Sequence, residues 1–347
     1  MKHCVLTYLL VLLCFNFFGQ EKKQYKICTI AFYNLENAFD TINDPHTYDE
    51  YSPILQTKQS KSEVYWNKLN NLASVLTQIG SNKNNQAPSV IGVSEVETSR
   101  VIDDLLTTKP FKDLIYDYVH IESEDWRGSD VALLYNPQHF QPTNYKAHRL
   151  WVFSYEGYRV KTRNILRVDG YLQDESISFI IVHWPSQRSG TEKTKHLRIA
   201  AAELTKKIIQ EIQSEIPNQK IVIMGDFNLD PHTDYFNEIL SVDSNKNTKE
   251  TELINPFIKL YKKGYGSIGF RDNLHLYDQI LMSSSLENKN FETFGFYEAG
   301  IYNPSFLINK KGRYKGYPFR SWGTNNQFTN GYSDHYPVYI YLLKELD

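Results

Sequence analysis

The chain has 347 residues, of which 41% are hydrophobic and 14% aromatic, enough for one large core or two smaller ones. Its formal net charge of -2 excludes a protein that attracts nucleic acid by an overall basic field, although a local basic groove is compatible with it. The cysteines exclude a cysteine-ligated zinc site, and Cys28 alone lies beyond the first twenty residues, which excludes an intramolecular disulfide there.

The first element is an apolar run at the N-terminus. Lys2 precedes the nearly all-apolar residues 5–18, and Gly19-Gln20 offers a cleavage point before a polar sequence. The run is shorter than the ~20 residues that span a bilayer, so it is typical of a secretory signal peptide rather than a transmembrane anchor. We expect a signal peptide over 1–19, one domain over 20–347 and an exported protein, secreted or periplasmic. We expect no stable membrane insertion after the signal is removed.

The rest of the chain alternates apolar runs with helical patterns, which indicates an α/β fold. Apolar residues at helical spacing predict helices over 63–80 and 192–213, with a short helix over 233–240. Surface loops are expected over 241–275, and a loop rich in aromatic and basic residues over 303–333. Strands are expected, in chain order, over 26–36, 89–97, 130–136, 176–185, 220–228, 277–283, 291–297 and 335–343.

Polar side chains recur where these strands end. One such residue is an ordinary turn or capping group. Several together favour a ligand site, because ligands gather where strand ends and loops converge. The residues in question are Asn34, Glu95, His183, Asp226 with Asn228, Asp278, and Asp334 with His335.

The residue types indicate a reaction class. Clustered carboxylates are hard oxygen ligands that suit Mg²⁺ or Mn²⁺, and Ca²⁺ also accepts such a site. No Gly-x-Ser-x-Gly elbow or P-loop is present, so serine hydrolases and P-loop NTPases lose support. Histidines and an arginine suit an anionic transition state, which leaves metal-assisted attack of water on a phosphoester.

The motifs also support a family resemblance. In order they read "NLEN", "SEVE", "RGSDVALLY", "VHWPS", "GDFN", "YDQI" and "SDH". This set resembles the endonuclease/exonuclease/phosphatase superfamily, which shares the DNase-I-like fold. The resemblance implies a four-layer α/β/β/α sandwich of two packed mixed β-sheets flanked by helices, with the site at one edge.

The resemblance also implies roles for individual residues. Glu95 resembles the main metal-binding glutamate, with Asn34 near the metal and phosphate and Asp334 at the metal side. Arg127 stands where several members place a phosphate-binding residue. Glu97, two residues beyond Glu95, shares metal binding in an alternative assignment.

Five further residues resemble the family's catalytic groups. Asp226 resembles the aspartate that orients or deprotonates the attacking water, and Asn228 would hold a phosphate oxygen and position Asp226. His335, oriented by Asp278, would contact the scissile phosphate. His183 would protonate or stabilise the leaving oxygen.

Five further residues are expected to assist. Glu122 would orient His183. The segment 314–323 is not part of the general family pattern, and its basic residues Lys315 and Arg320, with Tyr317 and Trp322, would neutralise phosphates and stack bases. A packed surface loop is the alternative for this segment.

The substrate is a phosphoester, and export with the basic aromatic segment favours a secreted nuclease or phosphodiesterase. The alternatives are a phosphatase or phospholipid phosphodiesterase acting through the same site, and a non-catalytic binder on the same scaffold. A membrane-acting enzyme would need an exposed apolar hairpin, which the sequence does not reveal. The complete residue set argues against the binder, and no obligate protein partner is evident.

Overall fold

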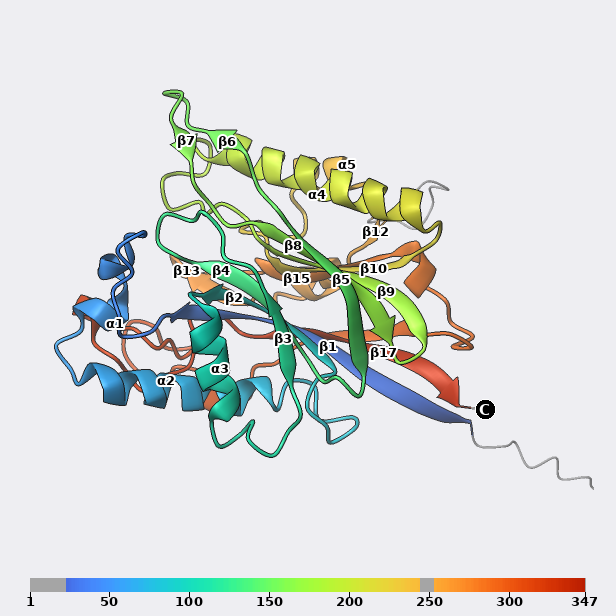
Figure 1. Ribbon diagram of the computed structural model, residues 1–347, viewed down its shortest axis with the longest axis horizontal. Coiled ribbons are helices and arrows are strands. Elements are labelled where there is room, and N and C mark those ends of the chain that lie inside the picture. The colour runs from blue at the N-terminus through green and yellow to red at the C-terminus, as the bar shows by residue number, and fades with distance from the viewer. Residues whose placement is uncertain (1–22, 244–252, 347) are drawn as a thin grey trace, which may run out of the picture.

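The computed structural model describes residues 23–243 and 253–346 and contains two β-sheets that pack face to face (Figure 1). The expected signal peptide over 1–19 lies outside these residues. Within them, no helix has the length and apolar character that crossing a membrane requires. The first sheet has six strands in the order β16 (Gly295–Ile301), β17 (Val338–Leu346), β1 (Gln24–Ala38), β2 (Val90–Val96), β4 (Asp130–Tyr135) and β3 (Asp117–His120).

The second sheet has seven strands and is also mixed. Two-stranded ribbons lie outside both sheets: β6 (Val152–Phe153) with β7 (Arg159–Val160), and β13 (Ile268–Phe270) with β14 (Asn273–His275). The second sheet runs in the order β11 (Val242–Asp243), β12 (Leu253–Ile254), β15 (Asp278–Ser283), β10 (Lys220–Asp226), β9 (Glu175–His183), β8 (Ile165–Leu172) and β5 (Phe140–His148).

Helices cover the outer face of each sheet. Leu69 and Leu72 of α2 (Lys61–Leu76) pack with α3 (Ser99–Thr107) on the first sheet, and Ile208 of α4 (Lys195–Glu215) packs on the second. Between the sheets lies a core that includes Phe32, Phe179 and Met224. The expected four-layer α/β/β/α sandwich is therefore confirmed. The shorter helices are α1 (Pro53–Gln56), α5 (Asp234–Leu240) and α6 (Phe257–Lys262).

Several expected elements differ from the structure in their bounds or their type. The strand expected over 291–297 is β16, which begins at Gly295 because Phe291 turns the chain with φ 58°. The described part of 241–275 is more than surface loop, since it forms β12, α6 and the β13–β14 ribbon, and Phe257 is fully buried. Sequence reasoning also missed β5, whose Pro142 suits its position at the sheet edge.

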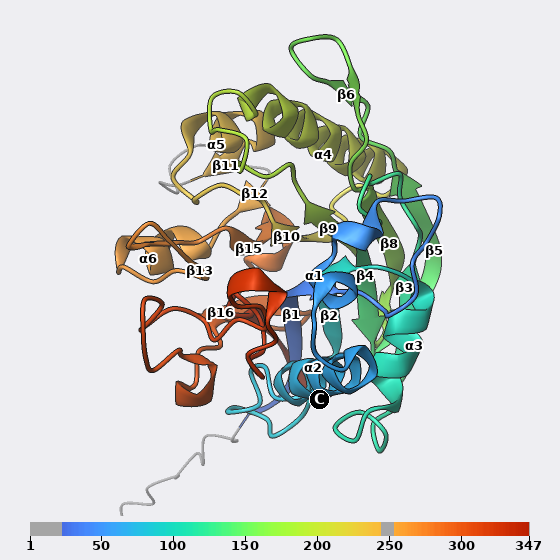
Figure 2. The same ribbon diagram turned by 90° about the vertical axis from the view of Figure 1, so that its left-hand side faces the viewer.

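The strand register brings distant polar residues to one edge of the sandwich. Asp226 at the end of β10 pairs with His183 on parallel β9 and with Asp278 on antiparallel β15. Strands β9 and β10 approach closely at Gly225, where a Cβ atom would lie 2.0 Å from the Val182 carbonyl oxygen. Figure 2 views the molecule from this edge, where loops from both sheets surround the strand ends.

Candidate active site

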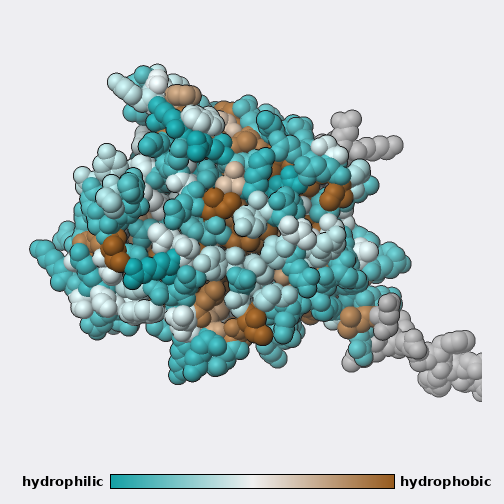
Figure 3. Space-filling model, viewed as in Figure 1, coloured by the Kyte–Doolittle hydropathy of each residue, from teal (hydrophilic) through white to brown (hydrophobic). Residues whose placement is uncertain are grey.

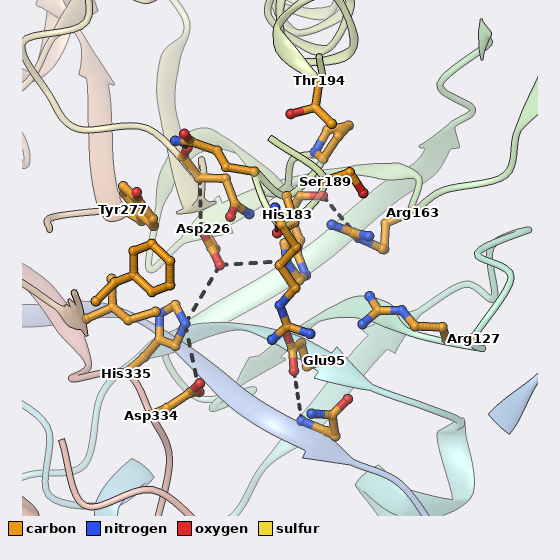
Figure 4. Close-up of a pocket in the computed structure, with 18 of the residues that line it drawn as sticks. Glu95, Arg127, Arg163, His183, Ser189, Thr194, Asp226, Tyr277, Asp334 and His335 are labelled. Atoms are coloured by element: carbon orange, nitrogen blue, oxygen red, sulfur yellow. Dashed lines mark hydrogen bonds and ion pairs between the residues drawn. The ribbon is translucent and has the colours of Figure 1, made fainter. Parts of the chain in front are cut away.

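Asp226 lies at the centre of a buried cluster at this edge (Figure 4). Its Oδ2 atom lies 3.6 Å from His183 Nε2 and 4.0 Å from His335 Nε2. The strand ends therefore bring together Asp226, both histidines and Asp278, which the sequence separates by up to 152 positions (335 minus 183). Two imidazoles around one carboxylate form an arrangement suited to proton transfer.

His335 is held as a cation. Its Nδ1 lies 2.6 Å from Asp278 Oδ2, and its Nε2 lies 3.9 Å from Asp334 Oδ1. Burial by itself would lower the His335 pKa, but the carboxylates of Asp278, Asp334 and Asp226 together outweigh burial and raise that pKa well above the ordinary value. A protonated His335 presents an Nε2–H group to any anion that enters the site.

His183 has the opposite electrostatic setting. Burial, followed by the nearby Arg163 and Arg127, lowers the His183 pKa well below its ordinary value. Its Nδ1 is buried and has no hydrogen-bond partner among the described residues. The expected role of Glu122 was therefore wrong, and Glu122 instead accepts a bond from Asn164 at its main-chain oxygen. His183 is neutral next to a charged His335.

Arg163 supports the main chain at His183 and does not contact the imidazole that Glu122 was expected to orient. Its Nε donates to the His183 carbonyl oxygen at 3.3 Å, and its Nη2 donates to the Trp184 carbonyl oxygen at 2.9 Å. Asp125 accepts from Arg163 Nη1 at 3.1 Å and lies 3.4 Å from Arg127 Nε. Sequence reasoning missed Arg163 and Asp125, because neither belongs to a recognisable motif.

Asn34 bridges two carboxylates. Its Nδ2 lies 3.2 Å from Asp226 Oδ2 and 3.4 Å from Glu95 Oε1, while its Oδ1 accepts the Glu36 N–H. Glu95 has φ 60° at a bulge in β2, and its Oε2 accepts the Asn37 N–H at 2.9 Å. Asn34 thus acts through its amide as a positioning residue, and Glu95 presents a carboxylate to the cleft.

The pKa of the Asp226 carboxyl lies near neutral pH. Burial, and then repulsion from Asp278, raise the pKa of Asp226 to about 7. The Asn228 N–H donates to Asp226 Oδ1 at 2.8 Å, and Asn228 Nδ2 donates to the Trp184 carbonyl oxygen at 3.0 Å. Asn228 therefore positions Asp226 and ties β9 to β10, and Asp226 has a pKa suited to accepting a proton.

A buried charge network stands behind Asp334. Arg320 Nη2 donates to Asp334 Oδ2 at 3.0 Å, and Arg320 Nε lies 3.8 Å from Glu36 Oε1. Lys68 donates to Ser321 Oγ at 2.7 Å, next to Arg320 in the chain. Burial would raise the Asp334 pKa, but His335 and Arg320 hold it below the ordinary value. Asp334 is therefore a fixed carboxylate.

The cluster opens into a cleft of about 1320 Å³. Lys315 does not line the cleft, whereas the neighbouring Arg313 and Tyr314 do, and the phosphate contact expected at Lys315 stays a prediction. Exposed aromatic residues at the rim include Trp126, Tyr48 and Phe270. The cationic side chains along the cleft are Arg127, Lys161, Arg163, Arg188, Arg271, Arg313 and Arg320.

Two groups of residues offer ligand atoms for a divalent cation. Ligand atoms of Asp226, Asp278 and His335 all lie within 4.8 Å of one another. However, Asp278 is bonded to His335, and a protonated imidazole has no lone pair for a metal. Glu95 and Asp334 both line the cleft and offer the oxygen donors that Mg²⁺ prefers, so they are the candidate ligands for a cation.

Glu97 lies outside the cleft lining, which contradicts its alternative assignment as a metal ligand. Its Oε2 accepts the Asp40 N–H at 2.7 Å, and burial, with Asp40 and Asp49 nearby, raises its pKa from 4.5 to about 8. Folding therefore favours protonated Glu97, and this carboxyl costs stability as pH rises from 4.5 through 8.

Replacing Glu97 with glutamine keeps the acceptor for Asp40 and removes this titration. We expect Glu97→Gln to raise the free energy of unfolding by about 1–3 kcal/mol at pH 9, with the difference shrinking toward pH 4. Urea denaturation across this pH range measures it. Parallel curves for the variant and the wild type would contradict the assignment.

The sequence model of the Endonuclease/Exonuclease/phosphatase family matches residues 29–344. A solved family protein from Bacteroides thetaiotaomicron has 15% identity and a TM-score of 0.55, covering 93% of this chain and 100% of its own. A mannosyl-6-phosphatase from the same organism has 15% identity and a TM-score of 0.52, covering 91% and 99%.

The D. rerio TDP2 structure complexed with a single strand DNA product has 12% identity and a TM-score of 0.51, covering 91% of this chain and 98% of its own. No curated protein matches the sequence. At these identities the solved structures support the fold, whereas the family match spans both sheets and the strand ends that carry the site. The chain belongs to the Endonuclease/Exonuclease/phosphatase family, and its site is that of a phosphoesterase.

Proposed function

We propose that this protein is an exported, divalent-metal-dependent phosphodiesterase that cleaves nucleic acid. The observation that carries the proposal is the cleft, in which a charged and a neutral histidine flank Asp226 and seven lysine and arginine side chains stand among the acidic groups of the lining. Its volume and its aromatic rim suit a polyanion whose bases stack on side chains. The apolar residues 5–18 support export.

The residues divide the hydrolytic work among themselves. Asp226, with a pKa of about 7, accepts the proton of the attacking water. His335 donates a hydrogen bond from Nε2 to the phosphate, because Asp278 keeps its imidazole charged and oriented. The neutral His183 lies on the other side of Asp226, beside the leaving oxygen. Arg127 and Arg188 in the cleft lining neutralise substrate phosphates.

A Mg²⁺ or Mn²⁺ ion would be held by Glu95 and Asp334 and would polarise a phosphate oxygen. The buried Asn34 fixes Glu95 relative to Asp226, and Arg320 fixes Asp334, so that both carboxylates are positioned before substrate binds. This positioning lowers the reorganisation needed in the transition state.

The proposal predicts metal-dependent cleavage of nucleic acid. The chain from residue 20 should be assayed with Mg²⁺ or Mn²⁺ on plasmid DNA, RNA, bis(p-nitrophenyl) phosphate and p-nitrophenyl phosphate. We expect DNA or RNA and the small diester to be cleaved, and both activities to vanish with excess EDTA.

The four substrates separate the alternatives. Faster hydrolysis of p-nitrophenyl phosphate than of any diester would contradict the phosphodiesterase and favour a phosphatase. If the protein cleaves bis(p-nitrophenyl) phosphate but neither DNA nor RNA, it is a phosphodiesterase whose substrate is not nucleic acid. If the protein binds a ligand but hydrolyses no substrate with either metal, it is a non-catalytic binding protein with the hydrolase fold.

A further inference from the structure

A hairpin formed by β6, β7 and their connecting turn projects from the body of the molecule beside α4 (Figures 1 and 2), and it stands out at the upper edge of the space-filling view (Figure 3). Val152 packs into the core layer under α4, so its neighbours on the strand point outward. Four aromatic side chains are exposed within eight positions: Trp151 57%, Phe153 52%, Tyr155 67% and Tyr158 76%. Exposed apolar surface this concentrated marks an interaction site.

The hairpin is continuous with the catalytic cleft. Its return strand leads directly into Val160, Lys161 and Thr162, which line the cleft. At its base, Glu124 forms ion pairs with Arg149 at 3.2 Å and with Arg159. Glu124 precedes the rim residues Trp126 and Arg127 by two and three positions, so this acid fastens the hairpin to the basic wall of the site.

Trp151 is held in a fixed orientation. The guanidinium carbon of Arg159 lies 3.8 Å from the centroid of its ring, and that of Arg149 lies 5.5 Å from it. More than half of the side chain still faces solvent. An aromatic ring next to arginines can stack a base while the cations neutralise the adjoining phosphates.

We propose that Trp151 and Phe153, with Arg149 and Arg159, form a strip that binds single-stranded polynucleotide extending from the cleft. The inference rests on the proposed function, because it takes nucleic acid as the substrate. It adds a second contact surface, outside the catalytic centre, which holds the part of the strand that flanks the scissile phosphate. Longer substrates would therefore bind more tightly than short ones.

A bilayer suits this hairpin less well. The turn places Glu156 between Tyr155 and Tyr158 at the most projecting point, and burying a carboxylate in hydrocarbon is costly. The Tyr155 ring already contacts His196 of α4 in a tilted arrangement, with ring centroids 4.2 Å apart and the ring planes at 42°. Trp151 and Phe153 present their aromatic surface at the base of the hairpin, next to the arginines and the cleft, whereas Tyr158 is exposed at the turn.

The test is equilibrium binding in EDTA, where no cleavage occurs. Fluorescence anisotropy would measure the Kd of fluorescein-labelled single-stranded DNA of about six and about twenty nucleotides. We expect Trp151→Ala/Phe153→Ala to raise the Kd for the longer strand at least about tenfold and the Kd for the shorter strand much less. Tyr171→Ala is the control, because Tyr171 is an aromatic residue with 47% exposure that lies at the end of β8 away from the hairpin. Melting temperatures verify folding.

Each other outcome is decisive. Equal affinities of the double variant and the wild type for the longer strand would overturn the strip. A wild type that hydrolyses bis(p-nitrophenyl) phosphate but binds no DNA would also overturn it and leave the phosphodiesterase standing. Loss of binding to vesicles of anionic phospholipid, with DNA binding intact, would assign the hairpin to a membrane surface instead.

Discussion

His335→Ala is expected to lower kcat on a phosphodiester about a thousandfold, with a much smaller change in KM. The reason is that His335 is the buried cation closest to Asp226, and its interaction with the phosphate strengthens as negative charge develops. Steady-state kinetics with saturating Mg²⁺ on bis(p-nitrophenyl) phosphate measures the loss.

Two further variants make this result specific. Asp278→Asn keeps the shape of the side chain but removes the carboxylate that holds the His335 Nδ1–H at 2.6 Å, so it should reproduce most of the loss and lower the pH at which activity falls. His139→Ala changes a half-buried histidine bonded to Ser89 outside the cleft lining and should retain kcat. Equal activity of His335→Ala and His139→Ala would refute the catalytic role of His335.

Lys68→Met is expected to lower the free energy of unfolding by about 3–5 kcal/mol. Lys68 is 2% exposed and donates to the Leu35 carbonyl oxygen at 2.9 Å and to Ser321 Oγ at 2.7 Å. Its removal leaves Glu36, itself buried, without one of the two cations that favour its ionised form.

The pH dependence of this loss has a defined sign. Burial, and then Asp334, raise the pKa of Glu36 to about 8, so folding favours the protonated acid and stability falls as pH rises. The defect of Lys68→Met should therefore be larger at pH 8.5 than at pH 6. The double variant Glu36→Gln/Lys68→Met should remove this dependence.

Lys61→Met, which changes an exposed lysine on the same helix, should change stability by less than about 0.5 kcal/mol. Coincident urea midpoints for the Lys61 and Lys68 variants would disprove the buried-network account.

The sequence anticipated the parts of the site that are carried by strand ends. Asp226 and His183 each end an apolar strand and Asp278 begins one, and strand pairing sets the three side by side once the sheet forms. The fold class followed from the ordered motifs. Element boundaries such as Gly295 were less predictable, because a single residue with positive φ moved the start of the strand.

The supporting residues were not predictable, because their partners are remote in sequence. Lys68 is an ordinary charged residue in an amphipathic helix until Ser321, 253 positions later, comes against it. Arg163 precedes a strand without any motif, yet it holds the carbonyl of His183. Lys315 and Arg313 lie in the same irregular loop, but only Arg313 lines the cleft. Hydrophobic periodicity does not predict which side chains of an irregular loop face a cleft.

The close approach at Gly225 ties catalysis to a position that has no functional group. A methyl group there would meet the Val182 carbonyl oxygen at 2.0 Å and would wedge β9 away from β10 at the level of His183 and Asp226. Proton transfer slows when the distance between donor and acceptor grows. The spacing of the two backbones at Gly225 therefore sets the 3.6 Å distance between His183 Nε2 and Asp226 Oδ2. In the proposed mechanism, turnover therefore depends on the absence of a side chain at residue 225. A substitution there would change the distance between His183 and Asp226 without changing either catalytic group.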